Sequence, residues 1–318
     1  MGSLKPDGPR VIRLSLEERL KGTYSLANLQ SALEGLHQDG LLVLESAVGV
    51  DHVDQLNTFM TNETASILKA KDPDGTLKAF NQGVKSNILH GPPVNNESLL
   101  FNDVYFNPFV IQIANAYLGS RPISNFMTGN NALPGTHGLR QPVHKDIRFH
   151  HPLAPFYFIA NIPLCDFGPA NGSTEFWLGS HQNTTSFEQQ VATAADADEY
   201  QMEGDPMCAL RPEVVEARRK IRPPIQPIIK KGDIVIRDLR LWHAGMPNET
   251  ETERIMIAIG YQAPWYPNLR QRHILPVSRC NFFQAAGGQP VELRANFVSD
   301  AEAESARHNE TFDFRPSM

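Results

Sequence analysis

The hydrophobic positions in the opening third of the chain follow a helix–strand–helix pattern. Apolar residues recur every three or four positions after Ser25, which predicts a helix with Ser25 as its N-cap and Gly40 as its end. The apolar face of this helix would carry Leu26, Leu29, Leu33 and Leu36. The continuous apolar run 41–44 predicts a buried strand, and a second helix follows from about Val50. Residues 70–100 show neither period and predict loops.

Beyond these loops the pattern changes to short strands. A helix over 108–118 is predicted by apolar positions three or four apart and by the closing Gly119. After it, short apolar runs are bounded by Gly, Pro and Asn, a spacing typical of strands. These runs cover 123–133, 139–147, 156–164, 173–178, 225–230, 233–237 and 254–262. The order predicts a mainly β fold with flanking helices, in which an N-terminal helical cap covers a sandwich or barrel.

The run 254–262 alternates cleanly, so its side chains divide between two faces of a strand. One face would hold Ile255, Ile257, Ile259 and Tyr261. The other would hold Arg254, Met256, Ala258 and Gly260. Because small residues lie on the arginine's face, we expect that face to leave room for a ligand.

The domain organisation follows from where this pattern stops. Residues 1–22 are polar and predict an irregular N-terminal arm, and residues 23–318 predict a single domain. The stretch 182–224 breaks the strand rhythm with polar, acidic and proline residues, and predicts an insertion with a helix near 212–221. We expect part of this insertion, the segment 200–208 from Tyr200 to Cys208, to cover the mouth of the candidate metal site that the motifs below indicate.

Composition narrows the class of protein. The 318 residues are 41% hydrophobic and 20% charged, enough apolar material for a large core. No apolar run reaches the roughly 18 residues of a membrane helix, and the N-terminus lacks a signal peptide's apolar stretch. A net charge of −6 disfavours nucleic acid, and three scattered cysteines predict neither disulfides nor a metal knuckle. We therefore expect a cytoplasmic protein, with no membrane or nucleic-acid partner and with a homodimer as one option.

The most informative chemistry lies in the tripeptide His144-Lys145-Asp146. In a strand, residues two apart point the same way, so His144 and Asp146 would share one face and could ligate a divalent metal. A third ligand is available in His243, which ends an apolar run 97 residues after Asp146. Two histidines and one carboxylate form the set that leaves positions open on ferrous iron. The alternatives are a surface ion pair for His144 and Asp146, and a core histidine for His243.

Arg254 follows His243 by eleven residues, across a predicted turn. A hairpin would bring the two strands together and place a guanidinium beside the metal group, where it could bind a carboxylate in bidentate fashion. A bridge from Arg254 to Glu253 or Asp238 is the alternative. Trp177 and Trp242 are expected to pack, and the other histidines near the motif are expected to have no catalytic role.

These motifs together resemble the iron(II)/2-oxoglutarate-dependent dioxygenases of the phytanoyl-CoA dioxygenase family, particularly fungal members that oxidise secondary metabolites. The similarity covers most of the chain. It rests on Gln141-Pro-Val-His144-Lys-Asp146, Asn171-Gly-Ser-Thr174, Gly179-Ser180-His181 and Gly232-Asp233 followed by His243 and Arg254. The resemblance implies a double-stranded β-helix, or jelly roll. It also implies that His144, Asp146 and His243 hold Fe(II), that Arg254, Gln141 and Thr174 bind 2-oxoglutarate, and that O2 is the oxidant.

One position departs from the family pattern. Some members carry a serine or threonine two residues after the distal histidine, and here that residue is Gly245. A cosubstrate contact from this position is therefore not expected.

The resemblance implies an oxygenase that acts on a small organic molecule by hydroxylation, desaturation or ring rearrangement and releases succinate and CO2. Two alternatives remain open at this stage, a non-catalytic cupin-like ligand-binding protein and an acyl-CoA hydroxylase. Another jelly-roll metalloenzyme that does not use 2-oxoglutarate is a third, and Arg254 argues against it because such an enzyme has no dicarboxylate to bind.

Overall fold

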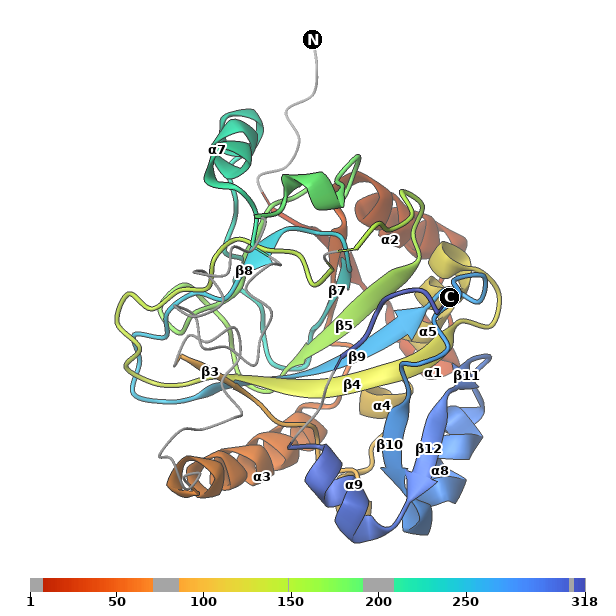
Figure 1. The fold of residues 1–318 in the computed structure, drawn as a ribbon. Coiled ribbons are helices and arrows are strands. Elements are labelled where there is room, and N and C mark those ends of the chain that lie inside the picture. The colour runs from red at the N-terminus through yellow and green to blue at the C-terminus, as the bar shows by residue number, and fades with distance from the viewer. Residues whose placement is uncertain (1–7, 71–85, 148, 191–208, 309–311, 318) are drawn as a thin grey trace.

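A computed structural model describes residues 8–70, 86–147, 149–190, 209–308 and 312–317. Its centre is a large, mostly antiparallel sheet in the order β1-β2-β7-β5-β9-β4-β11, with β3 also paired to β4 (Figure 1). In that order the strands are β1 (Arg10–Arg13), β2 (Leu41–Glu45), β7 (Ile234–Asp238), β5 (Tyr157–Pro163), β9 (Arg254–Gln262), β4 (Ile123–Ala132) and β11 (Glu292–Leu293), with β3 (Asn87–Leu89) beside β4.

A second, smaller sheet faces the inner side of the large one. It consists of β6 (Glu175–Phe176) and β8 (His243–Ala244), extended by isolated bridges to Ile225 and His144. Side chains from both sheets, including Val43, Val235 and Phe176, form a small apolar core between them. Two facing sheets with helices outside confirm the predicted mainly β, jelly-roll architecture.

Helices cover the outer side of the large sheet. Its outward side chains, such as Ile257 of β9, join the main core with Leu36 and Ile113 from the covering helices. These helices are α1 (Leu16–Lys21), α2 (Leu26–Asp39), α3 (Val50–Lys69), α4 (Asn102–Tyr105) and α5 (Pro108–Leu118). α2 lies against β1 and β2, α5 lies against α2 and β5, and α3 runs below β4 (Figure 1). Among the described residues the remaining helices are α7 (Pro212–Ile221), α8 (Cys280–Ala285), α9 (Asp300–Ala306) and the 3-10 turns Glu97–Leu99, Ser186–Glu188, Val277–Arg279 and Ala286–Gly288.

Local capping signals placed three helices correctly. The Ser25 side chain accepts a hydrogen bond from the backbone N–H of Asn28 at the start of α2, as predicted. Gly40 ends that helix at φ 72°, and a Cβ there would lie 2.6 Å from the His181 ring, so glycine is required on both counts. The helices expected over 108–118 and near 212–221 are likewise present as α5 and α7.

The prediction of an irregular arm over residues 1–22 is wrong in its described part. Residues 10–13 form β1, which pairs in parallel with β2, and α1 follows with a capping box between Ser15 and Glu18. A four-residue edge strand is too short to show a period in sequence, and its partner lies about 30 residues away. The single-domain prediction for residues 23–318 stays a prediction.

Three predicted strands are shorter than expected or absent as regular strands. The segment 139–147 contributes only the isolated bridges of His144, and 225–230 contributes only those of Ile225 and Ile229. Of 173–178, only β6 is a strand. Prolines within 139–147 and 225–230 lack the N–H that a ladder needs, which explains why these segments pair at single points.

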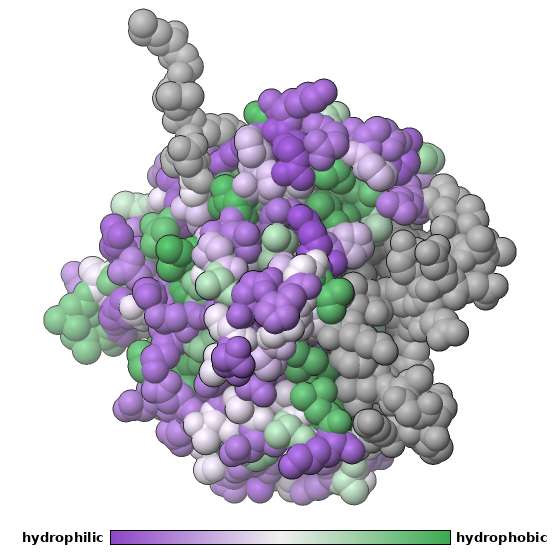
Figure 2. All heavy atoms as spheres, turned by 90° about the vertical axis from the view of Figure 1, so that its left-hand side faces the viewer, coloured by the Kyte–Doolittle hydropathy of each residue, from purple (hydrophilic) through white to green (hydrophobic). Residues whose placement is uncertain are grey.

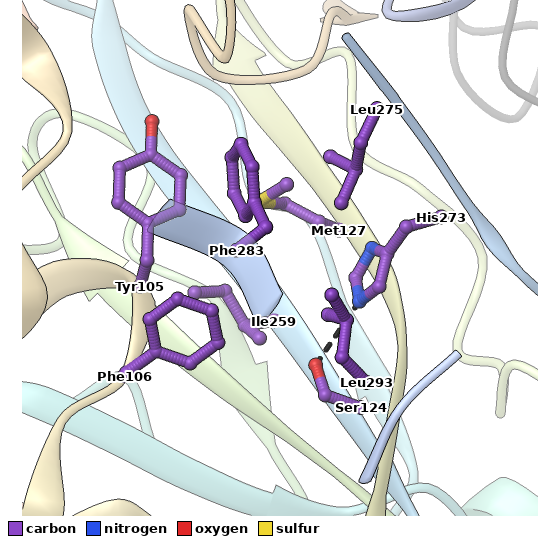
Figure 3. Close-up of a pocket in the computed structure, with 9 residues that line it drawn as sticks. All are labelled: Tyr105, Phe106, Ser124, Met127, Ile259, His273, Leu275, Phe283 and Leu293. Carbon is purple, nitrogen blue, oxygen red and sulfur yellow. Dashed lines mark hydrogen bonds between the residues drawn. The ribbon is translucent and has the colours of Figure 1, made fainter. Parts of the chain in front are cut away.

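The C-terminal segment adds a unit that the sequence pattern did not predict. Strand β10 (His273–Pro276) pairs in parallel with β12 (Ala295–Val298), and α8 and α9 flank them. Figure 3 shows where this unit meets the large sheet: Leu275 and Phe283 face Met127 and Ile259 in an apolar pocket. The polar contact there joins Ser124 Oγ to His273 Nε2 at 3.0 Å.

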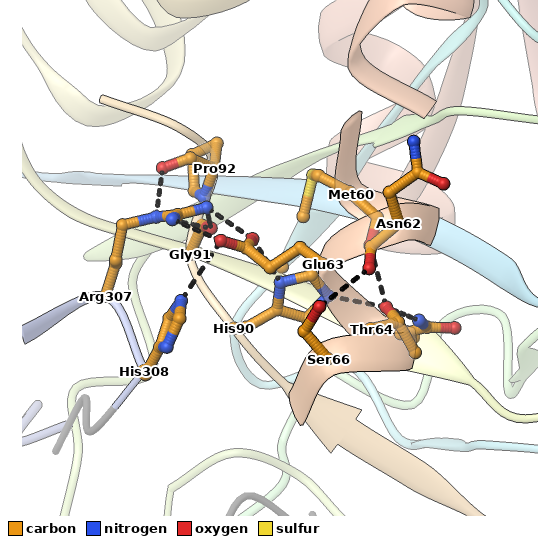
Figure 4. A network of polar contacts seen from close by, with 12 residues as sticks. Met60, Asn62, Glu63, Thr64, Ser66, His90, Gly91, Pro92, Arg307 and His308 are labelled. Atoms are coloured by element: carbon orange, nitrogen blue, oxygen red, sulfur yellow. Dashed lines mark hydrogen bonds and ion pairs between the residues drawn. The ribbon is translucent and has the colours of Figure 1, made fainter. Parts of the chain in front are cut away.

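An ion-pair cluster joins the end of this unit to α3 (Figure 4). Arg307, directly after α9, donates through both terminal nitrogens to the Glu63 carboxylate at 2.6 Å. His90 Nδ1 and His308 Nε2 contact the same carboxylate at 3.1 and 3.3 Å. The cluster therefore fixes the end of α9 to α3.

None of the described helices is both long and apolar enough to cross a bilayer. On the face of the molecule shown in Figure 2, hydrophobic side chains of the described residues are scattered among hydrophilic ones.

Candidate active site

His144, Asp146 and His243 meet on the inner side of the smaller sheet. The backbones of His144 and His243 hydrogen-bond to each other in both directions, N to O, at 2.9 Å. This antiparallel contact places both rings beside Asp146, whose Oδ1 lies 3.6 Å from His144 Nε2 and 3.7 Å from His243 Nε2. One ligand atom from each residue lies within 4.8 Å of the other two, so the three predicted ligands are assembled.

Backbone carbonyls fix the orientation of the two imidazoles. His144 Nδ1 lies 2.8 Å from the Pro142 carbonyl, and His243 Nδ1 lies 3.0 Å from the Leu241 carbonyl. Each Nδ1 therefore carries the proton and donates it, which leaves both Nε2 lone pairs directed toward Asp146. Burial lowers the pKa of both histidines, that of His243 most strongly, so both rings are neutral near pH 7. A neutral imidazole is the form that binds a metal.

Asp146 is kept ionised by its surroundings. Burial alone would raise the pKa of Asp146, but the positive charge of Arg237 and the hydrogen bond that it donates lower it well below the ordinary range. Arg237 Nη2 donates to Asp146 Oδ2 at 2.5 Å. Two neutral imidazoles and a carboxylate, with no thiolate, are the donor set of ferrous oxygenases, so the residues fit Fe(II).

Arg254 lies at the start of β9 and is 1% exposed. Its guanidinium stacks over the Phe167 ring at 4.6 Å, and Nε and Nη1 have no hydrogen-bond partner among the described residues. Burial lowers the pKa of Arg254 to about 10. The alternative bridge to Asp238 does not form, because that carboxylate is held by Arg240. An unpaired, buried guanidinium is ready to receive an anion, and the distal carboxylate of 2-oxoglutarate fits it.

Gln141 is held next to the metal group by Gly245. Its Oε1 accepts the Gly245 N–H at 2.8 Å, while its Nε2 is buried and without a partner in the described part of the chain. A Cβ at Gly245 would lie 2.5 Å from that Oε1. Gly245, the departure from the family pattern, is therefore explained by Gln141, whose amide fills the space that a side chain at 245 would need. The free Nε2 is available to a ligand, as the predicted role of Gln141 requires.

Thr174 is half-buried directly before β6, whose Phe176 pairs with His243. Its predicted contact with 2-oxoglutarate stays a prediction. The expected room along the arginine's face of β9 is not available at Gly260, because a Cβ there would lie 2.7 Å from the Tyr157 hydroxyl and 2.9 Å from Phe126.

Two polar residues of the site escaped the sequence analysis. Arg237 shares the inner side of β7 with Val235, and Asn161 of β5 pairs with Val235 and Ala258. Asn161 Oδ1 is buried and, within the described residues, unpaired. Each of them is a charged or amide residue inside an otherwise apolar predicted strand. Such a residue indicates that the strand faces a polar interior, and this could have been noticed in the sequence.

The other candidates have structural roles. Trp177 and Trp242 pack with Leu210 and Val215 in a separate apolar cluster, as predicted. His137 pairs with Glu249 at the surface. Burial raises the pKa of the Cys165 thiol, which makes it unreactive.

A second group of possible ligands, Glu63, Glu304 and His308, also lies within 4.8 Å. Arg307 lies among these residues: it is bonded to the Glu63 carboxylate at 2.6 Å, as Figure 4 shows, and to the Glu304 carboxylate at 2.6 Å. A guanidinium in that place neutralises the acids and takes the position a cation would need, so this group is an ion-pair cluster.

The described ends of the 182–224 insertion pack against the metal-ligand segment. Leu210 N–H donates to the Val143 carbonyl at 2.8 Å, and the Gln189 amide donates to the Ile147 carbonyl at 2.7 Å. The segment predicted to cover the site, Tyr200–Cys208, lies outside the described residues.

Comparison with known proteins agrees with this geometry. The family model for phytanoyl-CoA dioxygenase (PhyH) matches residues 36–256. The solved structure of EvdMO1 is 18% identical with a TM-score of 0.53, covering 74% of this chain and 50% of its own, so this chain spans about half the length of EvdMO1. AviO1 from Streptomyces viridochromogenes Tue57 is also 18% identical, with a TM-score of 0.52 and coverage of 77% and 99%. These likenesses show the fold.

Proposed function

Because this chain belongs to the phytanoyl-CoA dioxygenase family, we propose that it is an iron(II)- and 2-oxoglutarate-dependent dioxygenase that oxidises a small organic molecule. One observation carries the proposal: a metal-binding group of two histidines and an aspartate borders the same apolar core as a buried guanidinium that has no partner among the described residues. Arg254 stacks on Phe167, and Phe176 of the same core lies 6.5 Å from the His243 ring. The two features together match the two ends of 2-oxoglutarate, a 2-oxo acid that chelates iron and a distal carboxylate that binds arginine.

The protein's own residues divide the work. His144, Asp146 and His243 would hold iron(II), and Arg254 with Gln141 would orient the cosubstrate. The chemistry that bound iron(II) and 2-oxoglutarate supply is oxidation by O2, with succinate and CO2 as by-products. The apolar residues between the sheets, Phe167 and Phe176 among them, exclude water from this interior.

The substrate we propose is a free small molecule of secondary metabolism rather than an acyl-CoA. The phosphates of coenzyme A would need exposed cations near the site. Three described cations beside the metal ligands are already engaged: Arg140 with Glu175 at 3.0 Å, the fully buried Lys145 with Thr184 at 3.1 Å, and Arg237 with Asp146. This disfavours the acyl-CoA hydroxylase, and the intact ligand set disfavours a non-catalytic binding protein.

The test is to load the purified protein anaerobically with Fe(II) and then add 2-oxoglutarate, O2 and a metabolite extract of the organism that carries the gene. Succinate formation and O2 uptake are measured. We expect succinate in step with O2 use, and a product heavier by one oxygen or lighter by two hydrogens in untargeted mass spectrometry. His144→Ala and His243→Ala should lose iron and turnover while keeping the fold, and His137→Ala, a change at an exposed histidine, is the matched control. Normal iron content and succinate formation in either ligand variant would refute the assignment.

A further inference from the structure

Arg237 holds one oxygen of the metal-binding carboxylate and leaves the other free. Its Nη2 donates to Asp146 Oδ2 at 2.5 Å. The opposite oxygen, Oδ1, is the one that lies 3.6 and 3.7 Å from the two histidine Nε2 atoms. The two oxygens of Asp146 are therefore assigned to different partners.

The geometry of this pair is not the usual one for arginine and carboxylate. A guanidinium often grips both carboxylate oxygens through two parallel hydrogen bonds. Here a single nitrogen holds a single oxygen, and Nη1 of Arg237 is buried with no partner among the described residues. Arg237 therefore does not bind both oxygens of Asp146, and Oδ1 is left for another partner.

The backbone of β7 limits any change in this arrangement. Arg237 is 7% exposed, and its strand is paired on both sides, with Leu41 of β2 and Ile159 of β5 in register. The backbone that carries Arg237 is therefore fixed and burial restricts its side chain, so Oδ2 keeps Arg237 as its partner.

We propose that Arg237 is a positioning residue that makes Asp146 a one-oxygen metal ligand and thereby keeps the metal's remaining positions open. The inference rests on the proposed function. Two histidines and one oxygen leave three positions on a six-coordinate metal, two for the 2-oxo acid and one for O2. A carboxylate that bound through both oxygens would take one of these three. Arg237 prevents this by occupying Oδ2.

The rival explanation is that Arg237 only neutralises a buried carboxylate. Charge neutralisation would affect the stability of the apoprotein, but it would not change how many positions on the metal remain open to water. A measurement that counts metal-bound waters therefore separates the two roles.

The experiment uses Mn²⁺ as the probe, with the full-length protein and no turnover. Titration calorimetry gives the Mn²⁺ affinity, and the water-proton relaxation rate of the Mn²⁺ complex reports the exchangeable waters on the metal. We expect Arg237→Leu and Arg237→Gln to lower the relaxation enhancement by about one-third, as two waters replace three. The affinity of the Mn²⁺ protein for 2-oxoglutarate should fall by roughly 10–100-fold, the same size of effect that losing the partner of a metal ligand usually has on metal affinity or activity.

Two further variants make the result interpretable. Arg237→Lys keeps the buried charge and one donor, so it should fold where the leucine variant fails, and it should restore water count and 2-oxoglutarate affinity at least in part. Arg254→Met is the matched control, because it should weaken 2-oxoglutarate binding while leaving the water count of the Mn²⁺ protein unchanged.

If the Leu and Gln variants bind Mn²⁺ with the wild-type water count and 2-oxoglutarate affinity, Arg237 is only a charge partner and the inference is wrong, while the proposed function stands. If the unmodified protein binds neither Mn²⁺ nor 2-oxoglutarate, the proposed function falls and this inference with it.

Discussion

At the scale of single residues, Arg254 carries a charge that the protein itself does not pair. With its pKa lowered to about 10 by burial, the charged form costs on the order of 3 kcal/mol below that pH. Arg254→Met should therefore stabilise the apoprotein against urea. The same variant should lose the stabilisation that 2-oxoglutarate gives the Mn²⁺ form, about 2–5 kcal/mol for a buried charged pair.

Arg140→Met, at an arginine that already pairs with Glu175, is the control and should show neither effect. Undiminished 2-oxoglutarate affinity in Arg254→Met would mean that another cation binds the distal carboxylate.

Gly245 offers a second test at this scale. In Gly245→Ala the new Cβ would stand 2.5 Å from Gln141 Oε1, so the amide must turn away and release its hydrogen bond to the backbone. We expect a loss of about 1 kcal/mol in unfolding free energy and weaker binding of 2-oxoglutarate, measured by denaturation and by calorimetry. In the Gln141→Ala background the same glycine change should have little additional effect. Equal and additive losses in the two backgrounds would show that the residues act independently.

The metal ligands could be predicted from sequence because their chemistry and spacing are distinctive. His144, Asp146 and His243 meet as expected, although the supporting strand over 139–147 is absent and two isolated bridges, to His243 and Ala209, hold His144 instead. Arg237 could not be predicted in the same way. A lone arginine in a strand has many possible partners, and its contact with Asp146 spans 91 positions of the chain.

At the scale of elements, the attachment of α9 to α3 depends on one buried carboxylate. Glu63→Gln would leave Arg307 buried without its counter-charge, and breaking such a pair typically costs about 3–5 kcal/mol. We expect a lower midpoint in thermal unfolding and faster proteolysis after residue 290. Glu304→Gln, at a more exposed partner of the same arginine, should cost much less.

Chelators should not act through this ion-pair cluster on the thermal midpoint or on the rate of proteolysis, because the cluster holds Arg307 rather than a metal. A fall in stability on adding EDTA to a His243→Ala background, which lacks the other metal group, would contradict that view.

Elements with local signals were predictable and elements with distant partners were not. Ser25, Asn107 and Pro212 mark the starts of α2, α5 and α7. Each of these residues lies at the first turn of its own helix, so the signal is local in sequence. By contrast, β1 and β10 each depend on parallel pairing with strands some 20 to 30 positions away. No periodicity in a four-residue segment carries that information.

At the scale of the whole molecule, buried neutral histidines make the fold sensitive to acid. Burial lowers the pKa of His273 to about 3, and lowers that of His90 and His181 as well. In the unfolded chain these rings protonate near pH 6.5, so the unfolded state binds more protons below that value. Stability is therefore full above about pH 6.5 and is lost as the pH falls toward 3.

His273→Gln, which keeps a donor for Ser124 but cannot titrate, should recover about 2 kcal/mol of the loss between pH 6.5 and 5, measured by urea unfolding at both values. His137→Gln, at an exposed ring, should follow the wild type. The idea fails if His273→Gln loses as much stability on acidification as the unmodified protein.

The paired residues within the long insertion have a consequence for how the chain could vary at this place. Gln190 N–H donates to the Ala209 carbonyl at 2.8 Å, and Gln189 bridges Leu210, so the chain leaves and re-enters the jelly roll at one point. Lengthening a loop between closed ends costs only about 0.6 kcal/mol per doubling. Recombination, in evolution or in engineering, can therefore replace the stretch between Gln190 and Ala209 while His144, Asp146 and His243 keep their places.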